Sequence, residues 1–410
     1  MNFSGGWFDE IPTGWRALKI RRLCRVRRGA SPRPIDDPIY FDQNGSHGWV
    51  RISDVTSSNR TLWGTEQRLS QLGKSLSVEI KPGELFLSIA GSVGKPIIAG
   101  IPCCIHDGFV YFEGLEALPE FLYYIFISGR PYAGLGKLGT QLNLNTDTVS
   151  DIYVPLPQRP EQRGIVDFLD EQTVQIDELI AKKQRLIELL DERRTSLISQ
   201  VVTQGIDPGV PMKESGVPWL ARVPAHWQVK RLGRFCYLQR GHDLPDQERE
   251  PGKVPIVSSA GVSGSHIRAA AKGPAVVTGR YGSIGQVFYL DGPYWPLNTT
   301  LYSVSLFGND ARYAKFMLEH LPLASDSEKS AVPGVNRNYL HTLKVVCPPL
   351  DEQVRIAELC LATGSEFARL AEAVQHAIDL LREYRSALIT AAVTGKLDIR
   401  DHEKKMEALS

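Results

Sequence analysis

The stretch EQRGIVDFLDEQTVQIDELIAKKQRLIELLDERRTSLISQVVT, residues 161–203, is matched without a gap by EQVRIAELCLATGSEFARLAEAVQHAIDLLREYRSALITAAVT, residues 352–394. The offset between the copies is constant at 191 (352 − 161). Apolar residues recur in both copies at alternating spacings of four and three, which is typical of a coiled-coil seam. Each copy predicts a helix of about 40 residues, roughly 60 Å long at 1.5 Å per residue.

So long an amphipathic stripe needs a partner, and the other copy is the obvious one. Two long helices buried separately in a larger core are the alternative. Prolines precede both helix starts, where a missing N–H costs little: Pro157, Pro160, Pro348 and Pro349. The expected seam consists of Ile165, Leu169, Gln172, Ile176, Leu179, Lys183, Leu186, Leu190, Arg193, Leu197 and Val201 in the first copy, and Ile356, Cys360, Thr363, Phe367, Leu370, Val374, Ala377, Leu381, Tyr384, Leu388 and Ala392 in the second.

The repetition continues upstream of the helices at a different offset. An offset of 212 (227 − 15) joins the pairs Pro12/Pro224, Trp15/Trp227, Cys24/Cys236, Arg28/Arg240 and Gly29/Gly241. The GSVG loop at 91–94 and the GSIG loop at 282–285 return to the offset of 191. The two halves therefore differ by about twenty residues (212 − 191) between these anchors. Each half is a variable globular part followed by a constant helix.

The globular parts contain short strand-like runs, such as ELFLSIAG and AVVTGRYG, punctuated by Gly, Pro, Asn and Ser. We therefore predict an α+β fold, with two loop-rich α/β domains separated by two long helices that form a coiled coil. The predicted segments are a first domain at 1–155, a first helix at 156–204, a connector at 205–222, a second domain at 223–347, a second helix at 348–396 and a tail at 397–410.

Composition excludes several classes of protein. The apolar fraction of 42% and charged fraction of 23% are ordinary for a globular chain, and the net charge is only +1. We expect no membrane span and no secretion signal, because no long apolar run and no basic start before an apolar segment occur. The six cysteines show no CxxC pair, so we expect reduced structural thiols and a cytoplasmic protein.

The search for catalytic motifs finds no enzyme. A phosphate-binding loop ending at Gly94-Lys95 would need Gly at position 89 and Ser or Thr at 96, where Ile89 and Pro96 stand. His106-Asp107 and its like at His242-Asp243 have no nucleophile beside them, and are interpreted as surface pairs. We predict no catalytic residues and no metal site.

Binding signals are clearer. The stretch KIRRLCRVRRGASPRP, residues 19–34, contains seven basic residues and no acidic one. Lys and Arg neutralise phosphates, and Arg, Asn and Gln read base edges. Such residues recur at matched positions in both halves, although each alone is as easily a solvated loop residue. The candidate DNA contacts are Arg25, Arg27, Arg28, Arg33, Arg51, Lys95, Gln141, Asn143 and Asn145 in the first half, and Arg240, His242, Arg280, Tyr281, Asn336, Arg337 and Asn338 in the second.

Comparison of the two halves separates the residues of the basic stretch 19–34 into those that recur in the second half and those that do not. Cys24, Arg28 and Gly29 recur, so they serve the framework or a shared phosphate contact. In contrast, Arg25, Arg27 and Arg33 meet Tyr237, Gln239 and Pro245 in the second copy. These three arginines are the better candidates for contacts particular to the first domain.

These motifs together resemble the DNA-specificity subunit of type I restriction-modification systems. The likeness rests on the P-x-x-W segment with its Arg-Gly turn, the GS[VI]G loop, the repeated helix motif and the connector SGVPWLARVPAHWQVKRL, and it covers nearly the whole chain. It implies two target-recognition domains that each read one half of a bipartite asymmetric site in double-stranded DNA. It also implies that the two conserved helices form an antiparallel coiled coil, which acts as the spacer between the two domains.

The same resemblance implies the partners. Two modification (methyltransferase) subunits would bind S-adenosylmethionine, restriction (nuclease and translocase) subunits would cleave, and this chain would bind no cofactor of its own. One alternative is a scaffold whose coiled coil assembles proteins and whose globular ends bind peptides. The other is a stand-alone enzyme with an unrecognised site in a globular half.

Overall fold

The computed structural model describes residues 7–8, 10–135, 144–280, 285–321 and 334–399. The chain divides into two compact units, Met1–Lys182 with Ala377–Ser410 and Lys183–His376, here called unit 1 and unit 2. Each unit contains the beginning of one long helix and the end of the other. Each long helix is therefore shared between the two units.

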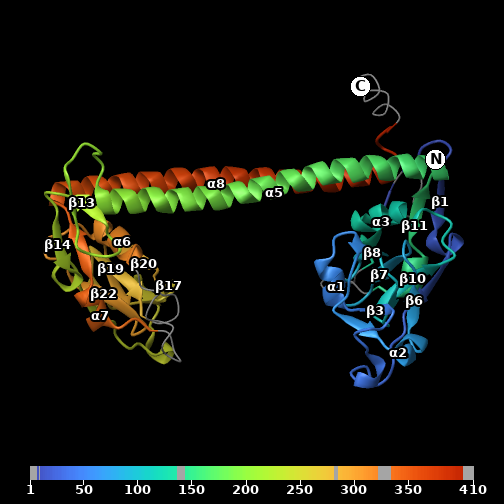
Figure 1. The fold of residues 1–410 in the computed structure, drawn as a ribbon, viewed down its shortest axis with the longest axis horizontal. Helices are drawn as coiled ribbons and strands as arrows, with labels where there is room; N and C mark the ends of the chain where they lie inside the picture. Colours follow the sequence, from blue (N-terminus) through green and yellow to red (C-terminus); the bar gives the residue numbers. More distant parts are fainter. Residues whose placement is uncertain (1–6, 9, 136–143, 281–284, 322–333, 400–410) are drawn as a thin grey trace. The chain divides into compact units, whose positions relative to one another are not determined.

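The long helices are α5 (Arg159–Gln204, 46 residues) and α8 (Leu350–Val393, 44 residues), both drawn in Figure 1. Both run without a break, which confirms the expected pair of long helices. In unit 1 they are antiparallel. The start of α5 at Ile165 lines a cavity with Gly395, beyond the end of α8, and further along α5 the Asp177 carboxylate meets Arg385 of α8 at 2.9 Å.

The expected seam was wrong at several positions in the middle of the helices. Leu179 and Leu186 of α5 are 46% and 42% exposed, while their neighbours Ile180 and Ile187 are partly buried. In α8, Leu370 and Tyr384 are 46% and 55% exposed, whereas Ile378 is fully buried. Adjacent apolar residues fit two registers one residue apart, and packing rather than periodicity selects between them.

The described residues of unit 1 form three sheets, with strand orders β1-β11, β2-β10-β7-β8-β4 and β5-β3-β9-β6. Its strands are β1 (Arg16–Lys19), β2 (Arg25–Arg28), β3 (His47–Val50), β4 (Thr61–Leu62), β5 (Gln67–Leu69), β6 (Val78–Ile80), β7 (Leu85–Ser88), β8 (Pro96–Ala99), β9 (Cys103–Ile105), β10 (Phe109–Glu113) and β11 (Tyr153–Leu156). Its short helices are α1 (Ile52–Ser57), α2 (Gln71–Ser75), α3 (Pro119–Ile127) and α4 (Thr146–Ser150). Helix α3 joins the sheet to α5 and α8 in one apolar core.

Unit 2 contains sheets with strand orders β12-β13, β14-β23, β15-β22-β19-β20 and β17-β16-β21-β18. Its strands are β12 (Met212–Glu214), β13 (Arg222–Pro224), β14 (Gln228–Arg231), β15 (Tyr237–Arg240), β16 (Val254–Ser258), β17 (Gly261–His266), β18 (Ala271–Lys272), β19 (Ala275–Gly279), β20 (Val287–Leu290), β21 (Pro293–Pro296), β22 (Thr300–Ser305) and β23 (Lys344–Cys347). Its short helices are α6 (Ala311–Glu319) and α7 (Arg337–Thr342). The mixed α/β character expected for both halves is confirmed.

The difference in length between the halves has a definite place. In unit 1 the antiparallel strands β3 and β5 are separated by α1 and β4, whereas in unit 2 the matching strands β16 and β17 are joined by a two-residue turn, 259–260. The change of offset seen in the sequence therefore comes mainly from an insertion between two paired strands. The frame around that insertion is the same in both units.

A buried glutamine joins each domain to its long helix. In unit 1, Gln162 accepts a hydrogen bond from the Leu118 backbone N–H at 2.9 Å and donates one to the Pro157 carbonyl at 2.9 Å. In unit 2, Gln353 accepts from the Asp310 backbone N–H at 2.9 Å and donates to the Pro348 carbonyl at 2.9 Å. The glutamine of the repeated Glu-Gln pair therefore fixes the start of each long helix to its domain, and we call Gln162 and Gln353 the staple residues.

Candidate nucleic-acid interface

The Arg-Gly turn at the end of β2 and of β15 has the same geometry in both units. A Cβ added to Gly29 would lie 2.2 Å from the His106 carbonyl oxygen, and one added to Gly241 would lie 2.2 Å from the Leu297 carbonyl oxygen. No side chain fits at either position, so only glycine, which has no Cβ, can stand there. The glycine shared by the repeats belongs to the framework.

The residues after each glycine bond to a facing turn. In unit 1 the Asp107 carboxylate accepts hydrogen bonds from Ser31 and Arg33, both at 3.1 Å, and the Asp107 carbonyl accepts one from Arg28. In unit 2, Asn298 at the matching position donates to Asp243. A polar residue on the facing turn therefore fixes the segment that follows the glycine.

The GSVG loop joins this edge in unit 1. The Ile89 backbone N–H donates to the Gly108 carbonyl at 2.9 Å, which places the loop beside the turn that contains Asp107. Gly91 has φ of +66°, and an added Cβ would meet Ile52 at 2.8 Å. The structure thus brings Arg28, Arg33 and the start of α1 after Arg51 to one end of the domain.

Lys95 is engaged rather than free. Its ammonium donates to the Thr56 carbonyl at 3.0 Å and to the Ser58 carbonyl at 2.7 Å, closing the carboxyl end of α1. Burial lowers the pKa of this lysine below its ordinary value. The two carbonyls give Lys95 a local structural task that the sequence did not reveal.

Three of the other arginines of unit 1 have carboxylate neighbours. Arg27 pairs with Glu113 at 2.7 Å across the β2–β10 ladder, and Arg51 lies 3.8 Å from Glu66. Arg33 pairs with Asp107 at 3.1 Å. Arg25 is exposed and, among the described residues, has no carboxylate within 4.0 Å. Exposed ion pairs contribute about 0–1 kcal/mol, so these guanidinium groups can exchange a carboxylate for a phosphate at low cost.

The matched asparagines of the two halves are helix caps. The Asn145 side-chain oxygen accepts from the backbone N–H groups of Asp147 and Thr148, both at 2.9 Å, at the start of α4. Asn336 accepts from the Asn338 backbone N–H at 2.9 Å, at the start of α7. Their recurrence therefore has a local backbone cause, and it does not by itself indicate base reading.

Replacement of Asn145 separates these roles. We expect Asn145→Ala to lower the stability of α4 by about 1 kcal/mol. Asn145→Ser keeps an oxygen acceptor and should change that stability by only about a few tenths of a kcal/mol. Hydrogen exchange at α4 and the salt dependence of DNA binding measure the two effects. A serine variant with native exchange but lost DNA affinity would instead assign Asn145 to base contact.

In unit 2 the predicted residues converge on the facing turn. The Arg280 backbone N–H donates to the Thr299 carbonyl at 2.8 Å, and the Val335 N–H donates to the Arg280 carbonyl at 2.8 Å, immediately before Asn336 and Arg337. The His242 ring lies 3.2 Å from the Tyr302 hydroxyl, and Arg240 is 3.8 Å from Asp243. The predicted residues Gln141, Asn143 and Tyr281 lie outside the described residues.

His106 is not a surface histidine. Its ring packs at 4.6 Å from the Phe109 ring and 5.9 Å from Trp49, and burial lowers its pKa. A neutral, partly buried imidazole fits a structural role under the Arg-Gly turn. The neighbouring Asp107, by contrast, stays at the surface.

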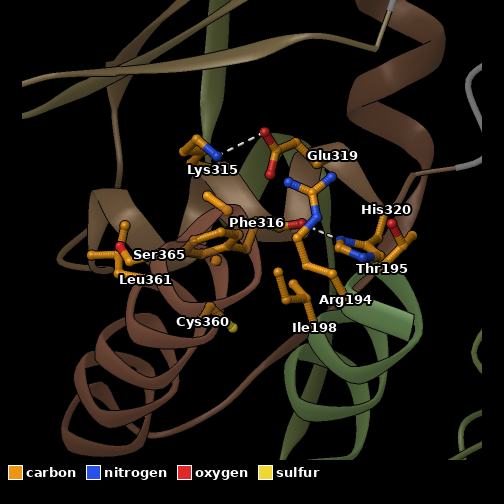
Figure 2. A pocket seen from close by; sticks show the side chains of 12 residues that line it. Arg194, Thr195, Ile198, Lys315, Phe316, Glu319, His320, Cys360, Leu361 and Ser365 are labelled. Atoms are coloured by element: carbon orange, nitrogen blue, oxygen red, sulfur yellow. Dashed lines mark hydrogen bonds and ion pairs between the residues drawn. The ribbon is translucent and has the colours of Figure 1, made fainter. Parts of the chain in front are cut away.

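No motif in the sequence predicts the cavities beside the long helices. Figure 2 shows one in unit 2, of about 490 Å³, between side chains of α5, α6 and α8; Phe316 lies beside Arg194 and His320, and Lys315 pairs with Glu319 at 2.7 Å. At the matching place in unit 1, Arg60 bonds to Asp170 of α5 and stacks on Tyr123. The cavity in unit 2 is lined by none of the predicted DNA contacts, and the one in unit 1 is lined by Lys95 alone among them. Both cavities therefore lie on the side of their domain that faces the long helices.

Metal and membrane features are absent from the described parts of the chain. No group of three or more His, Cys, Asp or Glu side chains there is placed to hold a metal ion. Within the same ranges, no helix has the length and apolar character needed to cross a bilayer. All six cysteines are unpaired, and burial raises the pKa of the Cys103 and Cys236 thiols to about 12.

A family model described as type I restriction modification DNA specificity domain matches residues 12–189 and 224–361. The specificity subunit of the type I restriction enzyme MjaIX from Methanocaldococcus jannaschii is 24% identical over 263 residues, which cover 60% of this chain and 58% of that protein. The chain therefore spans little more than half the length of this relative. The EcoprrI specificity subunit from Escherichia coli is 21% identical over 371 residues, covering 86% and 87%.

Two solved structures share the fold. One, described as the "structural basis underlying complex assembly and conformational transition of the type I R-M system", has a TM-score of 0.76 at 17% identity, and the match covers 95% of this chain and all of that one. The other, the HsdS subunit from Thermoanaerobacter tengcongensis, has a TM-score of 0.57 at 18% identity, with coverage of 97% and 100%. The arrangement of two similar domains and two long helices therefore recurs in these proteins.

Proposed function

This chain belongs to the type I restriction-modification DNA specificity family, and from that premise we propose that it reads the DNA target for a restriction-modification complex. Each globular domain reads one half of a bipartite, asymmetric site in double-stranded DNA. Helices α5 and α8 set the spacer between the half-sites. The chain performs no catalysis and directs partner subunits to the target.

One observation carries this proposal: the two units present different side chains on the same frame. Both have a glycine pressed against a facing backbone turn, and both have a polar residue on that turn, Asp107 or Asn298. The exposed positions nearby differ, with Arg25 and Arg27 matched by Tyr237 and Gln239. A shared frame with different reading residues is what two unlike half-sites require.

Exposed leucines on the helices support a pair of identical partners. In unit 1, Leu179 of α5 and Leu380 of α8 are 46% and 51% exposed. In unit 2 the matching residues, Leu370 and Leu189, are 46% and 45% exposed. Each unit thus offers the same pair of apolar side chains, one from each helix, and exposed apolar residues of this kind mark protein contacts. We assign them to two modification subunits.

Catalysis belongs to the partners in this proposal. The modification subunits bind S-adenosylmethionine and transfer the methyl group, and restriction subunits cleave. What this chain contributes is the choice of site. The phosphate contacts position each domain, and loop side chains at the base edges specify the sequence.

DNA binding by the purified chain with its modification subunits should weaken steeply with salt. If about five phosphates are neutralised, affinity for the target falls roughly 500-fold between 50 and 200 mM salt. Fluorescence anisotropy with a labelled duplex measures this slope. Salt-independent binding of peptides, without affinity for DNA, would instead favour the scaffold.

Methylation mapping in cells that carry the intact system tests the function directly. We expect a single bipartite motif, made of two unlike half-sites and a fixed unspecified spacer. The purified chain alone should transfer no methyl group to DNA. Methylation without a bipartite motif, or methyl transfer by this chain alone, would contradict the proposed function.

A further inference from the structure

A region of unit 2 that contains only two of the predicted contacts, Arg280 and Tyr281, has the charge expected of a DNA surface. Residues 251–290 contain no Asp or Glu, although the whole chain has 46 acidic residues among 410. The same forty residues include Lys253, Arg268, Lys272 and Arg280. The nearest acids in the chain, Glu250 and Asp291, stand just outside the stretch. A local excess of positive charge in a nearly neutral protein is an electrostatic signal for a polyanion.

This stretch folds in part as a hairpin at a sheet edge. Strands β16 and β17 pair antiparallel, and β17, which is labelled in Figure 1, is the outermost strand of its sheet. Four successive residues of β17, from Val262 to Ser265, are exposed, and the Val262 side chain is 69% exposed. A strand lying on a core alternates buried and exposed residues. The lack of alternation means that both faces of β17 are open to solvent.

The register of the hairpin adds a local twist. Ile256 pairs with Gly264 and the next residue, Val257, pairs with Val262, so Ser263 is left without a partner. Such a bulge bends the strand and redirects the extra side chain. Gly264 has φ of +150°, which glycine adopts readily. The serine between two exposed neighbours is thus turned away from the ladder.

The hairpin is continuous with the proposed interface of unit 2. The Leu297 backbone N–H, from the turn that faces Gly241, donates to the Val257 carbonyl at 2.9 Å. The His242 N–H donates to the Pro296 carbonyl at 2.8 Å, and Val257 pairs with Pro296. The turn end of the hairpin therefore adjoins the His242 segment through two backbone hydrogen bonds.

Resting on the proposed function, we propose that the β16–β17 hairpin is a reading ribbon for the second half-site. The major groove of B-DNA, about 12 Å wide, admits a two-stranded ribbon. The Ser263 and Ser265 hydroxyls face base edges, and the Val262 methyl groups contact a thymine methyl or a neighbouring base. Lys253 and Arg268 are exposed and, among the described residues, lack a carboxylate within 4.0 Å, so they take phosphates.

Unit 1 cannot offer the same ribbon. Its matching strands, β3 and β5, are separated by α1 and β4, and three residues of β5 pair with β3. The two domains therefore differ in the element itself as well as in its side chains. This difference suits an asymmetric target.

The test places a carboxylate at the tip of the hairpin. Val262→Asp, in the complex with its modification subunits, should weaken binding to the target duplex by about tenfold or more, since a contact at a base edge is lost and a negative charge meets the DNA. The matched control is Val304→Asp, on β22 in the same unit, where valine is 46% exposed. The control should bind within about twofold of the unaltered protein. Thermal unfolding of both variants should match the unaltered protein.

Two further measurements separate the possible outcomes. Arg268→Ala should reduce the slope of log affinity against log salt by about one. Ser263→Asn with Ser265→Asn should alter the methylated bases of one half-site and leave the other half-site unchanged. If the unaltered complex methylates a bipartite motif and Val262→Asp keeps full affinity, the ribbon is wrong and the proposed function stands. If the unaltered complex gives no bipartite motif, the proposed function itself fails.

Discussion

Replacement of Gln353 by leucine is expected to lower the free energy of unfolding at the junction of α6 and α8 by about 3–5 kcal/mol, because several buried groups lose their hydrogen-bond partner at once. The side chain is 1% exposed. Besides bonding the Asp310 N–H and the Pro348 carbonyl, its amide donates to the Asn309 side-chain oxygen at 2.8 Å. Leucine fills the volume but bonds none of these groups. Hydrogen exchange by mass spectrometry should show lost protection at the start of α6, while unit 1 keeps its protection.

The matched control is Gln228→Leu, the same change at an exposed position on β14. It should alter stability by no more than about 0.5 kcal/mol. Gln162→Leu should reproduce the large effect, but in unit 1 at the start of α3. If Gln353→Leu exchanges like the unaltered protein, the staple is not a stabilising element.

The repeated motifs could be predicted from the sequence because each has a local steric or hydrogen-bonding cause. Gly29 and Gly241 match because a carbonyl oxygen lies where a Cβ would stand. Trp15 and Trp227 match because each packs near the glycine that follows a long helix. Identical neighbours select identical residues, so a comparison of the two halves finds the framework without a structure.

The tasks of single polar residues could not be predicted in this way. The partners of Arg27 and Arg33, Glu113 and Asp107, stand 86 and 74 residues further along the chain. Only the folded sheet brings these charges together. Asn145 and Asn336 matched because the helices that they cap match. Recurrence in a repeat therefore indicates shared structure more strongly than shared recognition.

The reading ribbon shows that an element proposed for recognition need not recur in the repeat. Strands β16 and β17 match β3 and β5, but the two-residue turn that makes them a hairpin has no counterpart in the first half, so a search for repeated residues passes over it. Its signal in the sequence was the missing acids of 251–290, which becomes meaningful once β17 is known to be exposed on both faces. Elements that distinguish one target from another are expected where the halves differ, in and around the inserted segment.

Lengthening both long helices by three heptads is expected to lengthen the spacer of the DNA target, a larger change of target than any other variant should cause. Insertions of 21 residues after Lys182 in α5 and after His376 in α8 would keep the apolar seam in register. At 1.5 Å per residue each insertion adds about 32 Å, close to one turn of B-DNA. The half-sites should stay the same, and the spacer should grow by about nine or ten base pairs. Methylation mapping in cells carrying the variant complex measures both quantities.

Two control variants test the spacer as a helical ruler. Two heptads in each helix add about 21 Å, roughly six base pairs, so the second half-site would present a different face of the duplex. We expect methylation to fall sharply with this variant, although its helices are as regular as those of the longer one. A flexible Gly-Ser insertion of 21 residues in each helix should abolish the fixed spacer, because such a chain has no defined length. An unchanged spacer in the three-heptad variant would show that the separation of the half-sites is set elsewhere.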